Sequence, residues 1–468
     1  MVSASPVFVS VRELGERVRT RQVSPVELAE TFLGRLESIG PTYNAVVTLT
    51  CERAMDQARR AEAEIAAGEY RGPLHGIPYG AKDLLATSGG IPTTWGAAPL
   101  QNQTFEYDAT VVRKLEEAGA VLVAKLAMVE LAGGLGYSNT DAAFTGPGLN
   151  PWDRSTWTGG SSSGSGAAVA AGLVPFAIGS ETWGSILMPA SYCGVAGLRP
   201  TYGRVSRYGA MALSWTLDKL GPLGLTADDC GLVLDAIAGP DPLDRSAADR
   251  PYRYEVAEDR RFRLAVRKGA TEGVDDAVRF NFERAVDELA QVADIGEVAL
   301  PDYPYEAVAM IIFIGESSEA LDGLSQNGVI AGLTNPGSRL GHFSKAAVLA
   351  KEFHKALRIR GQIARDIDRL LRPYDALLTP TTDTPALPID VDLERGWSQG
   401  RVDIDGAVGN ALGLPAVSVP TGLSEAGLPT AIEFLGRTYS ENAVLSVARA
   451  YQGLTRWHEE RPPGTLPE

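Results

Sequence analysis

One stretch decides the fold of this chain, residues Thr158–Pro200, which read TGGSSSGSGAAVAAGLVPFAIGSETWGSILMPASYCGVAGLRP. Its opening, residues 159–166, contains only Gly and Ser, which favour tight turns and close backbone approach over regular elements. A helical stretch follows at 167–171, and then a short apolar strand at 173–178. Ser185 lies in the loop that leaves this strand, and open α/β sheets place their ligands at such strand ends.

The Gly/Ser loop runs into a helix N-terminus, where backbone N–H groups can bind an anion. The phosphate-binding pattern GxxxxGK[ST] is absent, however, because no Lys follows the glycines. We therefore do not expect a nucleotide site.

Four ordered blocks of sequence carry a resemblance to a known family: GIPYGAKD (76–83), GGSSSGSGAAVAAG (159–172), ETWGSI (181–186) and CGVAGLRPTYGRVSRYG (193–209). Together they resemble the amidase signature family, serine hydrolases that cleave amides and related carbonyl bonds. The resemblance covers nearly the whole chain and is tightest at 72–88, 127–222 and 374–458. The Gly/Ser loop alone would be a weak signal, but four blocks in the family's order are a specific one.

The resemblance implies a Ser–cis-Ser–Lys triad. Carried over by position, Ser185 is the nucleophile, Ser161 the bridging serine in a cis peptide, and Lys82 the base. It also implies an oxyanion hole made by the backbone N–H groups of the nucleophile loop, which would stabilise the charge that develops on the carbonyl oxygen: Thr182, Trp183, Gly184 and Ser185.

The chemistry of the residues agrees with that set. A serine hydroxyl is a poor nucleophile until a neighbouring base takes its proton, and none of the four histidines lies in a G-x-S-x-G context. A lysine can act as the base if burial lowers its pKa, because desolvation penalises the ammonium form. Lys82 lies between the apolar runs 77–81 and 84–85, and Ser161 would relay the proton between it and Ser185.

The nucleophile loop departs from the family's common reading, DTGGSIR. Trp183 replaces a glycine, Leu187 an arginine, and Ser163 a glycine of the second pair. Loss of the arginine removes a fixed cation near the nucleophile, and the indole goes either into the core or over the pocket as an apolar wall. The block MVELAGG (128–134) resembles the family's acyl-side lining. We therefore expect these residues to bind substrate: Met128, Gly133, Gly134, Trp183 and Leu187.

The fold expected is α/β, a single large domain with a mixed, mostly parallel sheet covered by helices on both faces. N-terminal helices would occupy 1–70, the signature core 71–240, a variable substrate-facing insert 241–345, and the C-terminal part of the core 346–468. Ser24, Pro25 and Glu27 form a capping box that predicts a helix to about residue 39. Residues 303–341, apolar runs broken by Gly, Asn and Pro, are expected as an irregular substrate-facing lid or a plain surface loop.

Composition excludes several functions. The 468 residues include 44% hydrophobic residues and carry a formal charge of −15, which argues against binding to nucleic acid or an anionic membrane. Three scattered cysteines indicate neither a disulfide framework nor a CxxC metal site. The first twenty residues lack a basic start followed by a continuous apolar core, and no run of 18 apolar residues occurs, so we expect neither a signal peptide nor a membrane span. We expect a cytoplasmic monomer or homodimer without metal or cofactor.

The sequence favours an amidohydrolase of small to medium apolar amides, which the resemblance extends to carbamates (urethanes) or aryl esters. The alternative is the glutaminase subunit of a tRNA-dependent amidotransferase, a partner-dependent component of similar length with the same signature. Trp183 and Leu187 disfavour that alternative. A catalytically dead binding protein is disfavoured because all three triad positions are intact.

Overall fold

The computed structural model describes residues 5–134, 136, 138–257, 260–339, 348–393 and 403–465. An eleven-stranded sheet runs through this part of the chain in the order β1-β3-β2-β4-β6-β5-β10-β11-β9-β7-β8. The strands are β1 (Val46–Leu49), β2 (Pro78–Lys82), β3 (Val121–Leu126), β4 (Phe176–Glu181), β5 (Ala196–Arg199), β6 (Lys219–Gly224), β7 (Phe262–Arg267), β8 (Ala293–Val298), β9 (Ala376–Pro380), β10 (Ala416–Leu423) and β11 (Pro429–Leu435).

The sheet is mixed, as expected, but the prediction that it is mostly parallel is wrong. Strand β2 pairs in parallel with β3 and β4, and β7 with β8 and β9, whereas the other pairings in the described sheet are antiparallel. The centre of the sheet consists of strands such as β10 and β11, which a short turn joins. Antiparallel neighbours need no helical crossover, so alternation of strands and helices along the sequence overestimated the parallel share.

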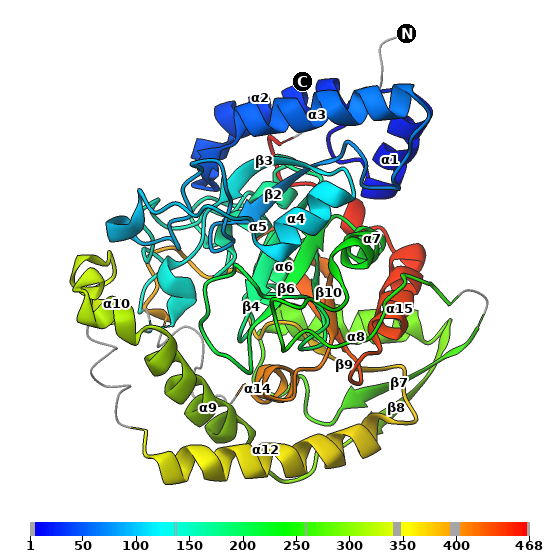
Figure 1. Cartoon of the computed structure of the whole chain (residues 1–468). Coiled ribbons are helices and arrows are strands. Elements are labelled where there is room, and N and C mark those ends of the chain that lie inside the picture. Colours follow the sequence, from blue (N-terminus) through cyan, green and yellow to red (C-terminus); the bar gives the residue numbers. More distant parts are fainter. Residues whose placement is uncertain are drawn as a thin grey trace.

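Helices cover both faces of the sheet (Figure 1). They are α1 (Val11–Arg19), α2 (Pro25–Ser38), α3 (Cys51–Ala66), α4 (Thr110–Glu117), α5 (Ser163–Ala170), α6 (Leu187–Cys193), α7 (Ala227–Ile237), α8 (Asp276–Leu289), α9 (Tyr305–Ala320), α10 (Asp322–Gln326), α12 (Ala350–Leu371), α14 (Ile404–Ala411) and α15 (Glu441–Leu454). Along β4, Phe176 and Ile178 belong to the core cluster with α4, α7 and α15, and Ala177 to the cluster with α5, α6 and α12. This alternation follows from the period of two in a strand.

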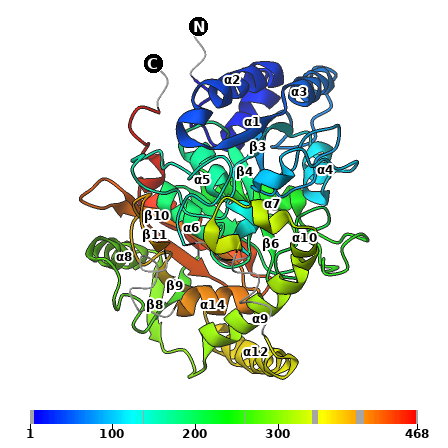
Figure 2. The same cartoon turned by 90° about the vertical axis from the view of Figure 1, so that its left-hand side faces the viewer.

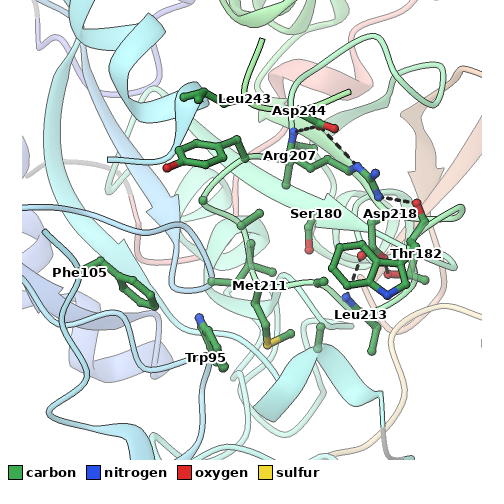
Figure 3. Close-up of a pocket in the computed structure, with 18 of the residues that line it drawn as sticks. Trp95, Phe105, Ser180, Thr182, Arg207, Met211, Leu213, Asp218, Leu243 and Asp244 are labelled. Atoms are coloured by element: carbon green, nitrogen blue, oxygen red, sulfur yellow. Dashed lines mark hydrogen bonds and ion pairs between the residues drawn. The ribbon is translucent and has the colours of Figure 1, made fainter. Parts of the chain in front are cut away.

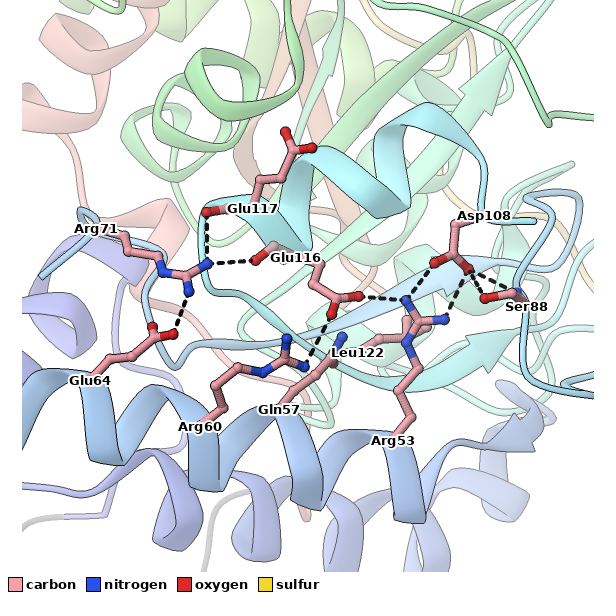
Figure 4. Close-up of polar contacts among 10 residues, drawn as sticks. All are labelled: Arg53, Gln57, Arg60, Glu64, Arg71, Ser88, Asp108, Glu116, Glu117 and Leu122. Carbon is pink, nitrogen blue, oxygen red and sulfur yellow. Dashed lines mark hydrogen bonds and ion pairs between the residues drawn. The ribbon is translucent and has the colours of Figure 1, made fainter. Parts of the chain in front are cut away.

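The N-terminal helices dock on the sheet through buried apolar contacts and a rim of charges. The helix predicted from the capping box begins at Pro25: the Ser24 hydroxyl accepts from the Glu27 N–H at 3.0 Å, and the Glu27 carboxylate accepts from the Ser24 N–H at 2.9 Å. Figure 4 shows α3 fixed to α4 by Arg53, whose guanidinium binds both Asp108 and Glu116 at 2.8 Å. This end of the molecule lies opposite α12 in both views (Figures 1 and 2).

The segment expected as an irregular lid, 303–341, is largely helical where it is described. It forms α9, α10, the short helix Val329–Gly332 and helical residues at 336–339; residues 340 and 341 lie outside the described residues. The prediction of an irregular segment is wrong because the middle of α9, residues 307–314, is apolar on every side, and the helix packs on both α12 and α14. A helix that is apolar all round has no amphipathic period to reveal it. No helix in the described ranges is both long and apolar enough to cross a membrane.

Candidate active site

Lys82 lies at an edge of the sheet where two parallel strands end together. It is the last residue of β2, and β2 pairs in parallel with β4, so the Lys82 side chain meets the end of β4 at the same edge. The side chain is fully buried. Its Nζ atom lies 2.7 Å from Oγ of Ser161, and 2.9 Å from the Oγ atoms of Ser162 and Ser180.

The three hydroxyls around Lys82 can accept from all three N–H donors of an ammonium, and they can also surround a neutral amine. Such an amine has two N–H donors and one lone pair, and three hydroxyls surround it. The Ser162 hydroxyl donates to the Ser180 carbonyl at 3.2 Å, so it can only accept from Lys82. If Ser180 also accepts, the Ser161 hydroxyl is left to donate its proton to the lone pair of the amine.

Burial holds the pKa of Lys82 well below its ordinary value of 10.5, and the more distant carboxylates Asp218 and Glu181 only partly oppose this effect. No carboxylate in the described part of the chain forms an ion pair with it. The neighbouring Asp83 instead pairs with the buried Lys125 at 3.1 Å. The Asp83 carboxylate is therefore paired with Lys125 and not with Lys82, so the ammonium form of Lys82 has no directly paired carboxylate to stabilise it.

Of the two serines of the predicted triad, Ser161 belongs to this cluster and Ser185 lies in the neighbouring loop. The peptide bond between Gly160 and Ser161 is cis, as the resemblance implies. Ser185 lies in the loop between β4 and α6 with 8% of its surface exposed, and its carbonyl accepts from the Ser162 N–H at 3.3 Å. The structure thus brings the Ser161–Ser162 backbone and the Ser185 loop into contact.

The four predicted oxyanion residues form the turn of the loop after β4. Gly184 has a φ of +81°, a backbone conformation that glycine adopts without strain. Within the described residues, the N–H groups of Thr182, Trp183, Gly184 and Ser185 donate no hydrogen bond to other protein groups. These donors are free for an external acceptor.

A buried carboxylate fixes this loop from below. Oε2 of Glu181 accepts from the N–H groups of Ile186 at 2.8 Å and Leu187 at 3.0 Å, the two residues after Ser185. Burial raises the pKa of Glu181, but the Arg199 guanidinium, 2.8 Å from Oε1, together with Lys219 and the Leu187 N–H outweighs that effect and lowers the pKa overall. Arg199 also pairs with Glu433 at 3.2 Å.

A pocket of about 320 Å³ opens beside the lysine–serine cluster (Figure 3). Ser180 and Thr182 form part of its lining, and Ser180 is one of the three hydroxyls that contact Lys82. The rest of the lining is mainly apolar and aromatic: Leu84, Trp95, Phe105, Tyr107, Ala132, Tyr208, Met211, Leu213, Trp215, Leu220 and Leu243. In Figure 3, Trp95 and Phe105 lie across Met211 from Thr182 and Asp218.

The charged groups of this pocket are committed to protein partners. Asp218 accepts from the Thr182 hydroxyl at 2.6 Å and from the N–H groups of Leu213 and Ser214. The Arg207 guanidinium donates to the Trp215 carbonyl at 2.8 Å and the Ser246 hydroxyl at 2.7 Å, and also pairs with Asp244 at 3.8 Å. In the described lining, no free cation faces the cavity.

The loop that carries Leu213 and Trp215 is clamped by helix α9. The Glu316 carboxylate, which is buried, accepts from the Ser214 hydroxyl and from both the N–H and the hydroxyl of Thr216, the latter two at 2.9 and 2.8 Å. The Trp215 indole N–H donates to Glu319 at 2.5 Å. One wall of the pocket is thus set by a helix distant in sequence.

The five residues expected to bind substrate do not line this pocket. Met128 and Leu187, both expected to bind substrate, are instead buried in the two core clusters. Trp183 lies closer to the first of its two expected paths: its ring packs against the core but stays partly exposed, donates its N–H to Asp403 at 2.6 Å, and does not line the pocket. Gly133 adjoins Ala132 of the lining, and a Cβ at Gly134 would lie 2.1 Å from Leu213, so its glycine leaves room for that wall.

Sequence reasoning missed Ser162, Ser180 and Asp218. Ser162 and Ser180 complete the hydroxyl shell of Lys82, and Asp218 fixes Thr182. The signal for Ser162 was its place beside Ser161 in the Gly/Ser loop. Ser180 is a polar residue at the end of an apolar strand, a pattern that indicates a ligand-facing position.

The fold and this site define an α/β enzyme with a lysine buried among serines at the sheet edge, and the comparisons with known proteins name its family. A family model described as Amidase matches residues 27–445. The chain is 36% identical to the A subunit of the glutamyl-tRNA(Gln) amidotransferase of Moorella thermoacetica over 485 residues, covering 97% of this chain and 98% of that protein. It belongs to the amidase signature family and acts on amide C–N bonds.

Two solved structures are similar over the whole length. The native peptide amidase of Stenotrophomonas maltophilia has a TM-score of 0.83 at 28% identity, with 98% of this chain and 99% of that chain covered. A structure described as a vestigial protein complex that reveals the origins of an s-triazine catabolic enzyme has a TM-score of 0.86 at 30% identity, covering 95% and 98%.

Proposed function

We propose that this chain hydrolyses small to medium amides with an apolar part through an acyl-enzyme on Ser185, with Ser161 and Lys82 as the proton relay. The observation that carries the proposal is the buried Lys82 amine, surrounded by three serine hydroxyls, one of which lines an apolar pocket. Carbamates and aryl esters would be cleaved by the same steps.

In the first half-reaction, the Lys82 amine takes the proton of the Ser161 hydroxyl as Ser161 takes the proton of Ser185. The Ser185 oxygen bonds to the carbonyl carbon, and the carbonyl oxygen becomes an oxyanion facing the free N–H groups of residues 182–185. When the C–N bond breaks, the proton returns through Ser161 to the leaving nitrogen. Water then attacks the acyl-enzyme by the same relay and releases the acid.

The lining of the pocket supports an apolar substrate. Burying apolar ligand surface contributes roughly 25 cal/mol per Å², whereas a carboxylate without a partner would be desolvated at a cost. The only lining cation in the described residues, Arg207, is already paired.

A fluorophosphonate and a substrate panel test this proposal. The probe should form an adduct on Ser185, located by mass spectrometry, and a panel of anilides, aliphatic amides, carbamates and esters with matched acyl groups should be hydrolysed. An adduct on another residue, with Ser185→Ala still active, would refute the assignment.

A second candidate is the glutaminase subunit of a tRNA-dependent amidotransferase. The curated relatives favour it, since the A subunit of the Moorella thermoacetica amidotransferase is 36% identical over nearly the full chain. Glutamine carries both a carboxylate and an ammonium group. Among the described lining residues, Arg207 and Asp218 already bind protein groups, which disfavours binding of these two charges. Its test is ammonia release from glutamine by the chain, alone and with a candidate partner protein, set against hydrolysis of an apolar amide. Glutamine turnover that depends on a co-purifying partner would favour this candidate over the first.

A further inference from the structure

The pocket beside Lys82 has one wall made almost entirely of aromatic rings. The rings form a continuous series in which each contacts the next: Trp95 to Phe105 with centroids 6.2 Å apart, Phe105 to Tyr107 at 5.7 Å, and Tyr107 to Tyr208 at 5.4 Å. We call these four residues the aromatic wall. All four line the cavity, and they come from two segments, 95–107 and 208, that lie far apart in the sequence.

The aromatic wall is partly open to solvent, although large aromatic side chains are usually mostly buried. Tyr107 is 42% exposed, and Trp215, in the lining contributed by the loop that α9 clamps, is 50% exposed. These are two of the few exposed large hydrophobic side chains in the described residues. Exposed aromatic surface gathered at a cavity marks a place for an apolar ligand.

The backbone beneath the wall is strained. Trp95 has a φ of +54°, and the neighbouring Leu131 and Ala132 have φ values of +48° and +53°. The Leu131 N–H donates to the Trp95 carbonyl at 2.8 Å, and the Trp95 N–H donates to the Asp83 carbonyl at 3.1 Å. Non-glycine residues rarely adopt this region, and where they do they cluster at functional sites. The ring of Trp95 is therefore held in place by the segment next to Lys82.

We propose that the aromatic wall is a subsite for a planar aromatic group of the amide substrate, next to the scissile bond. This inference rests on the proposed function. An aromatic ring can stack on, or approach edge-on, two or more of the wall's rings at once, whereas a saturated ring of the same size gains only area burial. Arg207 and Asp244 at this pocket are paired with each other and with neighbours, so the wall selects for ring shape rather than charge.

Matched substrate pairs test the subsite without changing the reacting amide. Phenylacetamide and cyclohexylacetamide place the ring on the acyl side, and N-benzylacetamide and N-(cyclohexylmethyl)acetamide on the amine side, each separated from the amide by a methylene. Because the cyclohexyl ring is slightly the larger, area burial alone would not favour phenyl. We expect kcat/KM to favour the aromatic member of at least one pair by roughly two- to tenfold, the range expected for one ring contact.

Variants of the aromatic wall then test whether its rings cause the preference for the aromatic substrate. Phe105→Leu and Tyr107→Leu should abolish it while the fluorophosphonate still labels Ser185. Phe280→Leu is the matched control, because Phe280 is 65% exposed on α8 and does not line the pocket. Unfolding temperatures and the Ser185 label exclude a folding defect; a wall variant that fails this check is replaced by the milder Tyr107→Ile.

The outcomes separate this inference from the proposed function. Equal kcat/KM within both pairs, or a preference that survives both wall variants, would overturn the subsite while hydrolysis and the Ser185 adduct leave the proposed function standing. An absent Ser185 adduct would refute the proposed function. In that case, binding of phenylacetamide and cyclohexylacetamide measured by calorimetry still decides whether the wall prefers the aromatic ring.

Discussion

The Nζ atom of Lys82 lies 2.7 Å from Oγ of Ser161, and no described carboxylate forms an ion pair with this buried nitrogen. An ammonium ion without a charge partner is unstable in such a place, and the pKa of Lys82 is lowered accordingly. The geometry therefore favours an amine that can accept a proton.

This relationship predicts how activity changes with pH. Below its lowered pKa, Lys82 is protonated and cannot accept the Ser161 proton, so kcat/KM should rise with pH through that pKa and then reach a plateau. Lys82→Met should lower kcat/KM by roughly 10²- to 10⁴-fold. Burial also lowers the pKa of Lys219, to about 7, so Lys219→Gln is the control. Loss of the rising limb in Lys219→Gln would assign the limb to Lys219 instead.

The hydroxyls around Lys82 should set the pH at which kcat/KM rises. Ser162 and Ser180 accept from the nitrogen in the proton arrangement described above, and a hydrogen bond stabilises the ammonium form more than the amine. Ser180→Ala should thus lower the pKa of Lys82 and move the limb to lower pH, with the plateau changed less than in Ser161→Ala. A pH profile that does not move in Ser180→Ala would show that this hydroxyl does not act on Lys82.

Glu181 should position the nucleophile loop. Its carboxylate holds the N–H groups of the two residues after Ser185, so Glu181→Ala should lower kcat by more than tenfold with a smaller change in KM. Glu433→Gln is the matched control, because Glu433, on β11, shares Arg199 with Glu181, whereas the N–H groups of Ile186 and Leu187 bind Glu181. If the two variants lose stability equally, as judged by urea unfolding, and also lose kcat equally, then Glu181 acts through general stability alone.

Trp183 should have little influence on substrate choice. Its indole binds Asp403 away from the pocket, so Trp183→Phe should cost about 1 kcal/mol of unfolding free energy through the lost hydrogen bond. The ratio of kcat/KM for an apolar and a polar amide should remain unchanged. A shift of that ratio by tenfold would show that the ring forms a pocket wall after all.

The buried pair of Asp83 and Lys125 predicts a double-mutant result. Removing one partner leaves an uncompensated charge, so Lys125→Met should lower the free energy of unfolding by about 3–5 kcal/mol. The double variant Asp83→Leu with Lys125→Met should recover part of that loss, because no lone charge remains buried. Additive losses in thermal and urea unfolding would contradict this coupling.

Contacts between residues close in the sequence could be predicted, whereas contacts between distant residues outside the motif blocks could not. The capping box at Ser24 and the ordered motif blocks are local patterns, and they gave the position of α2 and a candidate set that places Lys82 against Ser161. Ser180 meets Lys82 only because β2 and β4 are parallel neighbours, and no spacing in the sequence encodes that pairing. The Trp183 indole donates to Asp403, which lies 220 residues away in the sequence, so the sequence alone could not decide between the two expected paths for its ring.

The helix α9 was missed for a different reason. Its apolar residues surround the helix axis because α12 and α14 both pack on it, so the sequence lacks the one-sided period that distinguishes a surface helix. The aromatic wall escaped notice because its members, such as Phe105 and Tyr208, are separate in the chain and become neighbours only in the fold.

The clamp of Glu316 on residues 214–216 means that one side of the pocket entrance is held by a helix whose described side chains make no hydrogen bond to Lys82. The lysine–serine cluster is built on β2, β4 and the Gly/Ser loop, whereas the position of Trp215 is dictated from α9. A substitution that shifts α9 by a fraction of a turn would reshape the entrance for substrate without moving the Lys82 nitrogen. Changes in α9 alone could thus alter which substrates enter, while Lys82, Ser161 and Ser185 stay unchanged.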